Sequence, residues 1–364
     1  MKRSGRVVSY IVAALVLPFN VAIAGPSRES FTPHRNAVVM TQNLYLGTDV
    51  ALLLAPTTLP GLIAAVTFAL QQVQFTNFAE RAPRIADEIA TTGPALVGLQ
   101  EVAKWSTGAT PDAPDVRFDF LALLLDALEA KGAHYVPVVV RTNLDAAAPG
   151  LDQNNQLIFV RLVDREVLLA RTDLPTSDLK ISNLQTQTFS HLFSFFNPLV
   201  GQITVPRGWI SADVKVRGKT FRFINAQLES FDPDVQLDQA NELLAGPAST
   251  SMPLVLSGDF NSSADGGPDA TQTYPDLLAA GFEDAWAEAN PLDAGDTCCQ
   301  DASLDNDSSE LFERIDLVLL RGGIGVAGAE LIGTMPDLMA APPFWPSDHA
   351  GLVATLRIPT QAAP

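Results

Sequence analysis

The apolar run in the stretch LVLSGDFNSS, residues 254–263, ends abruptly at a carboxylate and an amide. Asp259 and Asn261 are two residues apart, and residues i and i+2 of a strand share one face. Both side chains would therefore point into one cleft, with Phe260 turned back into the core. A lone Asp or Asn at a strand end is more often a turn former or a helix cap, so this pair indicates catalysis only together with other residues.

Other polar residues also fall at or close to the ends of predicted strands. They are Asn43, Glu101, Gln227 and Asp316, and Asp348 and His349 stand just before the last strand. Carboxylate and amide oxygens suit Mg²⁺ or Mn²⁺. The chain has 4 histidines and no Cys/His cluster in its sequence, so a tetrahedral zinc site is not expected. A bound Mg²⁺ or Mn²⁺ ion can neutralise negative charge on a substrate, and a nearby carboxylate can act as a general base.

Strands and helices must bring these residues together. Segments rich in Val, Ile and Phe indicate strands. They are AVVMTQN (37–43), PALVGLQEV (94–102), HYVPVVV (134–140), NQLIFVRL (155–162), REVLLAR (165–171), WISADVKV (209–216), TFRFINAQL (220–228), LVLSGD (254–259), RIDLVLL (314–320) and GLVATLRI (351–358). Helical periodicity appears from Asn77, from Phe118 through Lys131 and over residues 235–244. This order predicts one domain of mixed α/β architecture with both faces of its sheets covered.

Taken in order, the motifs resemble the endonuclease/exonuclease/phosphatase superfamily, which includes deoxyribonuclease I and bacterial sphingomyelinases. The matching motifs are TQNLYLG, VGLQEV, RGWISADVKV with FINAQLES, LSGDFNSS, RIDLVLL and PSDHAGLVATL, and they span about residues 36–358. The resemblance implies an α/β four-layered sandwich of two packed mixed β-sheets flanked by helices, with the active site at one edge. It also implies a divalent-metal-dependent phosphodiesterase, either nuclease-like or acting on phospholipid head groups.

The resemblance also implies a metal site. Glu101 corresponds to the principal ligand, Asn43 lies beside it, and Asp348 is a second metal or water ligand. The expected ion is Mg²⁺, with Mn²⁺ as the other candidate.

The same resemblance implies roles for four catalytic side chains. Asp259 would orient and deprotonate the attacking water, and Asn261 would position water or phosphate through its amide. His349 would hydrogen-bond the phosphate, while Asp316 keeps the imidazole oriented and protonated.

One position departs from the family pattern. The usual N-T-H-L motif is NAQL in this chain, so Gln227 stands where histidine is expected. A glutamine amide can donate a hydrogen bond to a phosphate oxygen but cannot deliver a proton. The alternative function is therefore a non-catalytic or weakly active binding protein that keeps the fold. The intact acidic positions favour the enzyme.

Two further residues are candidates for substrate contact. Arg207 would either face a substrate phosphate or pair with a surface carboxylate. Tyr45 would either line the cleft or be a buried aromatic next to the strand.

The first 24 residues have the pattern of a signal peptide. Three basic residues precede the apolar stretch 7–16, and an A-x-A cleavage pattern ends at Ala24. A membrane anchor is the alternative, which Pro18 and Asn20 disfavour because they cut the apolar run short. The chain from Gly25 is expected to be secreted or periplasmic. The full sequence has a formal net charge of -18, which weakens the case for non-specific nucleic-acid binding. Bound cations can nevertheless reverse the electric field locally at a nuclease site.

Three other segments allow two interpretations each. The apolar residues 51–72 are interrupted by prolines and are expected to pack as helix on the core. Residues 191–205 either cover a sheet or form an exposed hairpin that contacts a membrane. The acidic residues 293–310 are expected to be a solvated loop rather than a calcium site, and they contain Cys298 and Cys299, which form either a vicinal disulfide or two free thiols. The expected partner is a phosphate ester: a nucleic acid, a nucleotide or a phospholipid head group.

Overall fold

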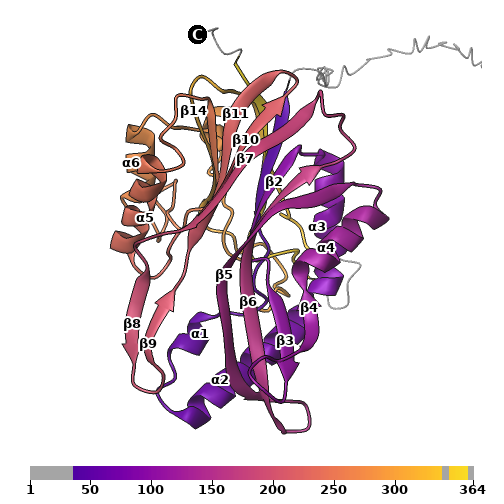
Figure 1. The fold of residues 1–364 in the computed structure, drawn as a ribbon, viewed down its shortest axis with the longest axis vertical. Coiled ribbons are helices and arrows are strands. Elements are labelled where there is room, and N and C mark those ends of the chain that lie inside the picture. Colours follow the sequence, from indigo (N-terminus) through magenta and orange to yellow (C-terminus); the bar gives the residue numbers. More distant parts are fainter. Residues whose placement is uncertain (1–35, 338–343, 360–364) are drawn as a thin grey trace, which may run out of the picture. The chain divides into compact units, whose positions relative to one another are not determined.

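Two large mixed β-sheets organise residues 36–337 and 344–359, which the computed structural model describes (Figure 1). The first sheet has 8 strands in the order β15, β16, β1, β2, β6, β3, β4, with β5 also paired to β6. Its strands are β1 (Ala37–Asn43), β2 (Leu96–Gln100), β3 (Lys104–Gly108), β4 (Asp115–Asp119), β5 (Tyr135–Leu151), β6 (Leu157–Arg171), β15 (Gly325–Ile332) and β16 (Gly351–Arg357).

The second sheet has 6 strands in the order β13, β14, β12, β11, β10, β7. They are β7 (Leu179–Thr188), β10 (Gly208–Val216), β11 (Lys219–Gln227), β12 (Leu254–Asp259), β13 (Glu283–Asp284) and β14 (Asp316–Arg321). Each sheet contains both parallel and antiparallel pairs. In the first sheet, β1 pairs with β2 in parallel and with β16 in antiparallel orientation. In the second sheet, β12 pairs with β11 in parallel and with β14 in antiparallel orientation.

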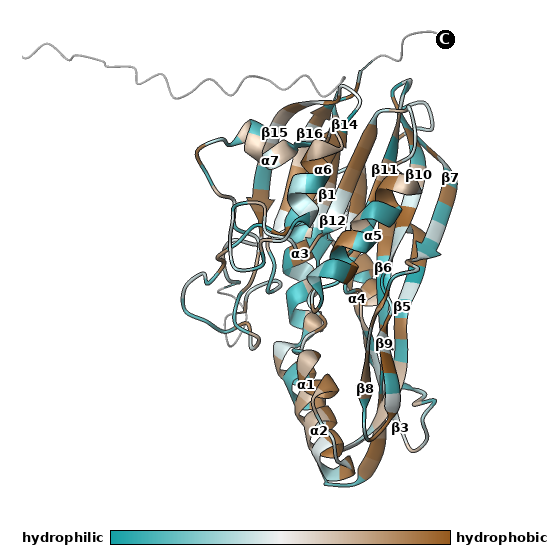
Figure 2. Cartoon of the chain, turned by 90° about the vertical axis from the view of Figure 1, so that its left-hand side faces the viewer, coloured by the Kyte–Doolittle hydropathy of each residue, from teal (hydrophilic) through white to brown (hydrophobic). Residues whose placement is uncertain are grey.

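Alternation along the strands builds the layers between and outside the sheets. Val39 of β1 and Val255 of β12 are buried in the core between the sheets, whereas Met40 points to the outer face of the first sheet. The helices are α1 (Ala51–Leu54), α2 (Leu59–Thr76), α3 (Phe78–Thr92), α4 (Phe120–Ala130), α5 (Pro233–Ala245), α6 (Thr273–Ala279) and α7 (Ala285–Ala289). Helices α2 to α4 pack outside the first sheet, and α5 and α6 pack outside the second (Figures 1 and 2). This confirms the predicted four-layered sandwich.

A polar bridge links the two sheets near the ends of β2 and β11. Gln100 donates a hydrogen bond from Nε2 to Asn225 Oδ1 over 2.7 Å, and both residues are fully buried. The same asparagine lies against Gly98, where an added Cβ would come within 2.2 Å of Asn225 Oδ1. Glycine is therefore required at this close approach, and the relative position of the two strands is fixed directly beneath the polar strand ends.

Long connections extend from the first sheet. The predicted helix over residues 51–72 is confirmed as α1 and α2, with Thr58 capping α2 through a hydrogen bond from the Gly61 amide. Strands β5 and β6 form a hairpin much longer than the separate strands that the sequence predicts, because β6 runs unbroken through Asp164. Residues 193–205 form a separate hairpin of β8 (Phe193–Asn197) and β9 (Gly201–Val205), which lies beside α1 (Figure 2).

The expectations for the signal peptide, for membrane-spanning segments and for the start of α3 have different outcomes. The proposed signal peptide, residues 1–24, lies outside the described residues, and the described residues all belong to one compact unit that spans residues 35–364. Within the described part of the chain, no helix is long and apolar enough to cross a membrane. Asn77 precedes α3 as predicted but makes no side-chain cap, because it has a left-handed backbone at φ 31°.

Candidate active site

The catalytic candidates meet at one end of the sandwich because neighbouring strands end side by side. Gln227 of β11 lies opposite Asp259 of β12, and Asp259 lies opposite Asp316 of β14. From the first sheet, Asn43 is the last residue of β1 and Glu101 directly follows β2. Asn43, Gln227 and Asp259 lie toward the space between the sheets, as the predicted alternation requires. Glu101 points there although Gln100 before it does too, because Glu101 has a left-handed backbone.

Two amides hold the carboxylates of Glu101 and Asp259 together. Asn43 donates from Nδ2 to Glu101 Oε1 over 3.0 Å and to Asp259 Oδ2 over 3.1 Å. Gln227 donates from Nε2 to the same two oxygens over 2.9 and 3.3 Å. Glu101 has a left-handed backbone at φ 55°, and its second oxygen accepts a hydrogen bond from the Leu46 amide. A strained backbone held by three hydrogen-bond donors is typical of a functional position.

His349 is paired with a carboxylate on its inner side. Its Nδ1 lies 2.7 Å from Asp316 Oδ2, which fixes Nδ1 as the donor and leaves Nε2 directed away from that partner. The nearest charged group to Nε2 is Asp348 at 3.9 Å, and Cys299 Sγ lies 4.0 Å away. The predicted arrangement of Asp316 behind the imidazole is therefore present in the structure.

Burial and neighbouring charges shift the pKa values of Asp259, Asp348 and His349. Burial, followed by repulsion from Asp316, raises the pKa of Asp259 to about 6. Burial also raises the pKa of Asp348 to about 7, although the His349 charge opposes this. Burial alone would lower the pKa of His349, but the charges of Asp316 and Asp348 outweigh it and raise that pKa well above the usual value. At neutral pH the imidazole is therefore charged and Asp259 is largely an ionised base.

The donor set fits a hard divalent cation. Ligand atoms of Asp259, Asp316 and His349 all lie within 4.8 Å of one another. Asp316 Oδ1 is buried without a hydrogen-bond partner, and the Glu101 carboxylate lies one hydrogen-bonded amide away from Asp259. Carboxylate and amide oxygens match Mg²⁺ or Mn²⁺ chemistry better than zinc chemistry. The first group is compact because Asp316 and His349 are hydrogen-bonded to each other.

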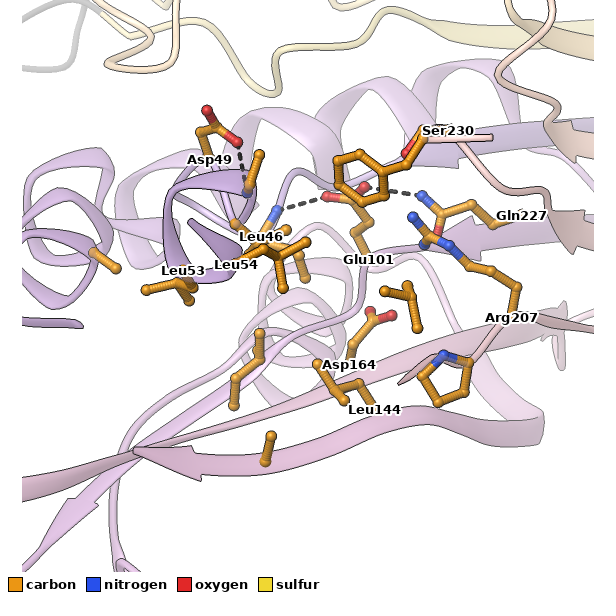
Figure 3. Close-up of a pocket in the computed structure, with 18 of the residues that line it drawn as sticks. Leu46, Asp49, Leu53, Leu54, Glu101, Leu144, Asp164, Arg207, Gln227 and Ser230 are labelled. Carbon is orange, nitrogen blue, oxygen red and sulfur yellow. Dashed lines mark hydrogen bonds between the residues drawn. The ribbon is translucent and has the colours of Figure 1, made fainter. Parts of the chain in front are cut away.

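A cavity of about 570 Å³ opens onto these residues (Figure 3). Glu101, Gln227, Asp259 and His349 line one end. Arg207 also lines it and donates from Nη1 to Gln227 Oε1. Of the two alternatives for Arg207, a surface ion pair is therefore wrong, since its guanidinium points into the site.

Two predictions about individual residues need correction. Asn261 is not on the strand, because β12 ends at Asp259 and Asn261 has a left-handed backbone at φ 49°. Its amide lines the cavity but donates from Nδ2 to the Leu228 carbonyl, while Phe260 is buried as predicted. Tyr45 is a buried aromatic rather than a cleft residue. Its hydroxyl donates to the Ala302 carbonyl, so it has no free group for substrate.

Several residues at the site were not predicted. Arg81 of α3 is fully buried and donates to the Leu44 and Pro346 carbonyls, which fixes the backbone on both sides of the site. Its position on the apolar face of α3, three residues after Phe78, was the available signal. The expectation of a solvated loop over residues 293–310 is wrong in part: Thr297 is buried and accepts the Asp316 amide. Cys298 and Cys299 form a vicinal disulfide beside His349.

Comparisons with known proteins agree with this fold. A family model described as the Endonuclease/Exonuclease/phosphatase family matches residues 40–349. The chain therefore belongs to this family, whose members hydrolyse phosphate esters. A search of curated protein sequences found no significant match.

Solved structures share the fold at low sequence identity. A family protein from Bacteroides thetaiotaomicron aligns with a TM-score of 0.55 and 16% identity, over 88% of this chain and 97% of that one. Mannosyl-6-phosphatase from Bacteroides thetaiotaomicron VPI-5482 gives 0.54 and 18%, over 88% and 99%. D. rerio TDP2 complexed with a single-strand DNA product gives 0.50 and 15%, over 88% and 98%. At these identities the likeness is one of fold.

Proposed function

We propose that this chain is an exported, divalent-metal-dependent phosphodiesterase. The observation that carries the proposal is the row Gln227, Asp259 and Asp316 on three adjacent strands, with His349 hydrogen-bonded to Asp316. This row supports the proposal, because a base and a charged hydrogen-bond donor at one end of the cavity are the combination that phosphoryl transfer to water requires.

Glu101 is the principal ligand of Mg²⁺ or Mn²⁺ in this proposal. Asn43 orients the Glu101 carboxylate by its hydrogen bond, and Asp348 supplies a further oxygen. When bound, the ion neutralises charge on the phosphoryl oxygens and so lowers the barrier to attack.

The protein's own residues perform the remaining steps. Asp259 accepts a proton from the attacking water as the new O–P bond forms and the bond from phosphorus to the leaving oxygen breaks. His349 donates from Nε2 to a non-bridging oxygen, while Asp316 retains the Nδ1 hydrogen bond. Gln227 and Arg207 add a neutral and a charged donor on the opposite side. The side chain of Asn261 supports the backbone here and supplies at most its Oδ1 to water.

A binding protein without activity remains the second candidate. The observation in its favour is Gln227, which carries no transferable proton. The structure gives little support to this alternative, because a site kept only for binding has no need of an Asp316–His349 pair or of a buried carboxylate with the pKa of Asp259.

The described surface also supports a peripheral membrane contact as part of the proposal. Phe196 and Val200 at the turn between β8 and β9 are 72% and 56% exposed. Apolar side chains at the tip of a hairpin can enter the lipid interface. A secreted or periplasmic location is consistent with the predicted signal peptide, and a phosphate ester remains the expected substrate.

A direct assay tests the proposed function. The chain from Gly25 would be incubated with bis(4-nitrophenyl) phosphate, plasmid DNA, RNA, sphingomyelin and phosphoinositides, with Mg²⁺ and with EDTA. We expect Mg²⁺-dependent release of 4-nitrophenol and activity on at least one natural diester. A protein that binds these substrates without turnover under any metal would instead support the second candidate.

A further inference from the structure

The cavity at the active site continues far beyond the catalytic residues. Away from the carboxylates of Glu101 and Asp259, most wall residues are apolar and come from α1, α2, β5, β6 and β9, with Asp49 and Thr204 as polar exceptions (Figure 3). Leu53, Leu62, Val66 and Leu162 are among the lining side chains. Its volume of about 570 Å³ lies in the range of small-molecule sites, which is too small for a protein segment with its own secondary structure.

Small side chains keep this space open. Ala147 and Ala148 of β5 line it on one side, and Ala69 of α2 lines it on the other. Protein interiors are normally packed to crystal density, so a cavity of this size that is continuous with a catalytic centre indicates room for a ligand. The apolar lining cannot hydrogen-bond water, which makes a hydrocarbon group its natural occupant.

Two polar side chains line the cavity close to the catalytic residues. Arg207 and Asp164 both line the cavity there (Figure 3). Arg207 Nε and Asp164 Oδ1 are buried and have no hydrogen-bond partner within the protein. Buried polar atoms normally have partners, so these two are placed to pair with polar atoms of a bound molecule. The cavity therefore combines catalytic carboxylates, unpartnered hydrogen-bonding atoms and apolar walls.

We infer that the substrate is an amphiphilic phosphate diester, with its phosphate at Glu101 and Asp259 and a single hydrocarbon chain in the apolar part of the cavity. This inference rests on the proposed function, since it names the substrate class of the same site. Polar atoms close to the phosphate, such as those of an ester or amide link, meet Arg207 and Asp164. The occupant is part of the substrate because the apolar walls and the catalytic residues line one continuous cavity.

A homologous series of soluble esters tests the inference. Methyl, butyl and octyl 4-nitrophenyl phosphates share one leaving group, so differences in kcat/KM report the alkyl chain. Each methylene removed from water should raise kcat/KM about threefold to fourfold until the cavity is filled. We expect octyl to exceed methyl by at least about 10²-fold below its aggregation concentration. Equal values for the three esters would overturn the inference while leaving the phosphodiesterase in place, whereas absence of turnover for all three would overturn both.

A blocking variant localises the effect. Ala148→Phe fills the cavity and should remove most of the advantage of the octyl ester, with the methyl ester hydrolysed at the wild-type rate. Ala130→Phe, at the exposed end of α4, is the matched control and should keep the advantage. Retained activity on the methyl ester shows that the blocking variant folds. Leu62→Trp repeats the test from the helical wall, and an undiminished octyl advantage in both blocking variants would refute the cavity assignment.

Binding without turnover gives a second readout. Calorimetry with octyl phosphate in the absence of metal should show a negative heat-capacity change, the sign of apolar burial, that Ala148→Phe reduces. A heat-capacity change that is the same in wild type and Ala148→Phe would contradict the inference.

The variant Phe196→Ser tests whether the substrate comes from a lipid surface or from solution. It alters the exposed hairpin tip and leaves the cavity lining intact. A slower reaction on single-chain lysophosphatidylcholine held in phosphatidylcholine vesicles, with hydrolysis of the soluble octyl ester unaffected, supports delivery from a lipid surface. If Phe196→Ser matches the wild-type rate on both the vesicles and the soluble octyl ester, the result supports a free amphiphile in solution.

Discussion

The side-chain amide of Gln227 donates a hydrogen bond over 2.9 Å to Oε1 of Glu101 and thereby connects the second sheet to the first at the catalytic centre. Arg207 donates to the other end of the same amide. Gln227 thus stands between a guanidinium and a carboxylate and orients both without a charge of its own. The site keeps its geometry at this position and lacks only a proton donor.

Gln227→His should restore that proton donor. We expect faster hydrolysis of alkyl phosphodiesters, whose poor leaving groups need a proton, and little change with nitrophenyl esters. The pH profile should gain a titrating step near neutrality. Steady-state rates on both substrate types across pH 5–9 measure this. Gln227→Met, which removes the donor altogether, is the control and should slow both reactions. An equal change on both substrates in the His variant, with no new step, would place Gln227 outside the reacting centre.

Glu101→Gln should weaken the dependence on metal. Loss of the principal ligand's charge is expected to raise the Mg²⁺ concentration for half-maximal rate by at least about tenfold, since even outer ligands change metal affinity that much. Mg²⁺ titrations of the rate would measure it. A wild-type titration curve would remove Glu101 from the metal site.

Asp259→Asn should abolish turnover while the fold is kept. Removal of a general base costs about 10²- to 10⁴-fold in rate. The asparagine amide can still take part in the hydrogen bonds of Asn43 and Gln227, so thermal melting should change little. The measurement is kcat of Asp259→Asn at saturating Mg²⁺. A variant as fast as wild type would mean that another group activates the water.

His349 and Asp316 should behave as one unit. His349→Ala is expected to lower kcat by about 10²-fold or more, comparable to the loss of one oxyanion donor. Asp316→Asn should lower kcat to a similar extent, because the imidazole then loses its charged partner at 2.7 Å. The double variant should be little slower than the worse single variant. Fully additive losses in this cycle would separate the two residues.

Glu166 should make stability depend on pH. Burial, with a smaller contribution from Asp164, raises the pKa of Glu166 to about 8, although Arg141 opposes this. Both of its carboxyl oxygens are buried without a hydrogen-bond partner. The neutral form is therefore favoured in the folded state, and its contribution is fully present below the unfolded pKa and is lost as the pH rises through about 8.

Urea unfolding from pH 5 to 9 tests this expectation. Glu166→Gln should flatten the fall in the free energy of unfolding over that range and be the more stable protein at pH 9. Glu129→Gln, whose parent side chain is 71% exposed, is the control and should follow the wild type. Parallel curves for wild type and Glu166→Gln would show that Glu166 is charged in the folded protein.

The strand-end residues could be predicted because alternation and motif order are local signals. Asp259 and Gln227 follow directly from the period of two along β12 and β11. Asn261 and Tyr45 were misplaced because each lies just past a strand in a left-handed conformation, φ 49° and 59°, which ends the alternation. Arg81 and the cavity depend on helices packing against distant strands, such as α2 against β5, and no pattern within one segment reports that contact.

The apolar cavity is built from segments that carry none of the catalytic groups. Its far walls belong to α1, α2, the β5–β6 hairpin and the β8–β9 hairpin, while the reacting side chains sit at or just beyond strand ends of the two sheets. Chemistry and selectivity are thus encoded in separable stretches of the gene. Lengthening, shortening or exchanging those walls would redirect the protein to another ester and leave its reaction untouched, so natural divergence and laboratory recombination both have an easy route here.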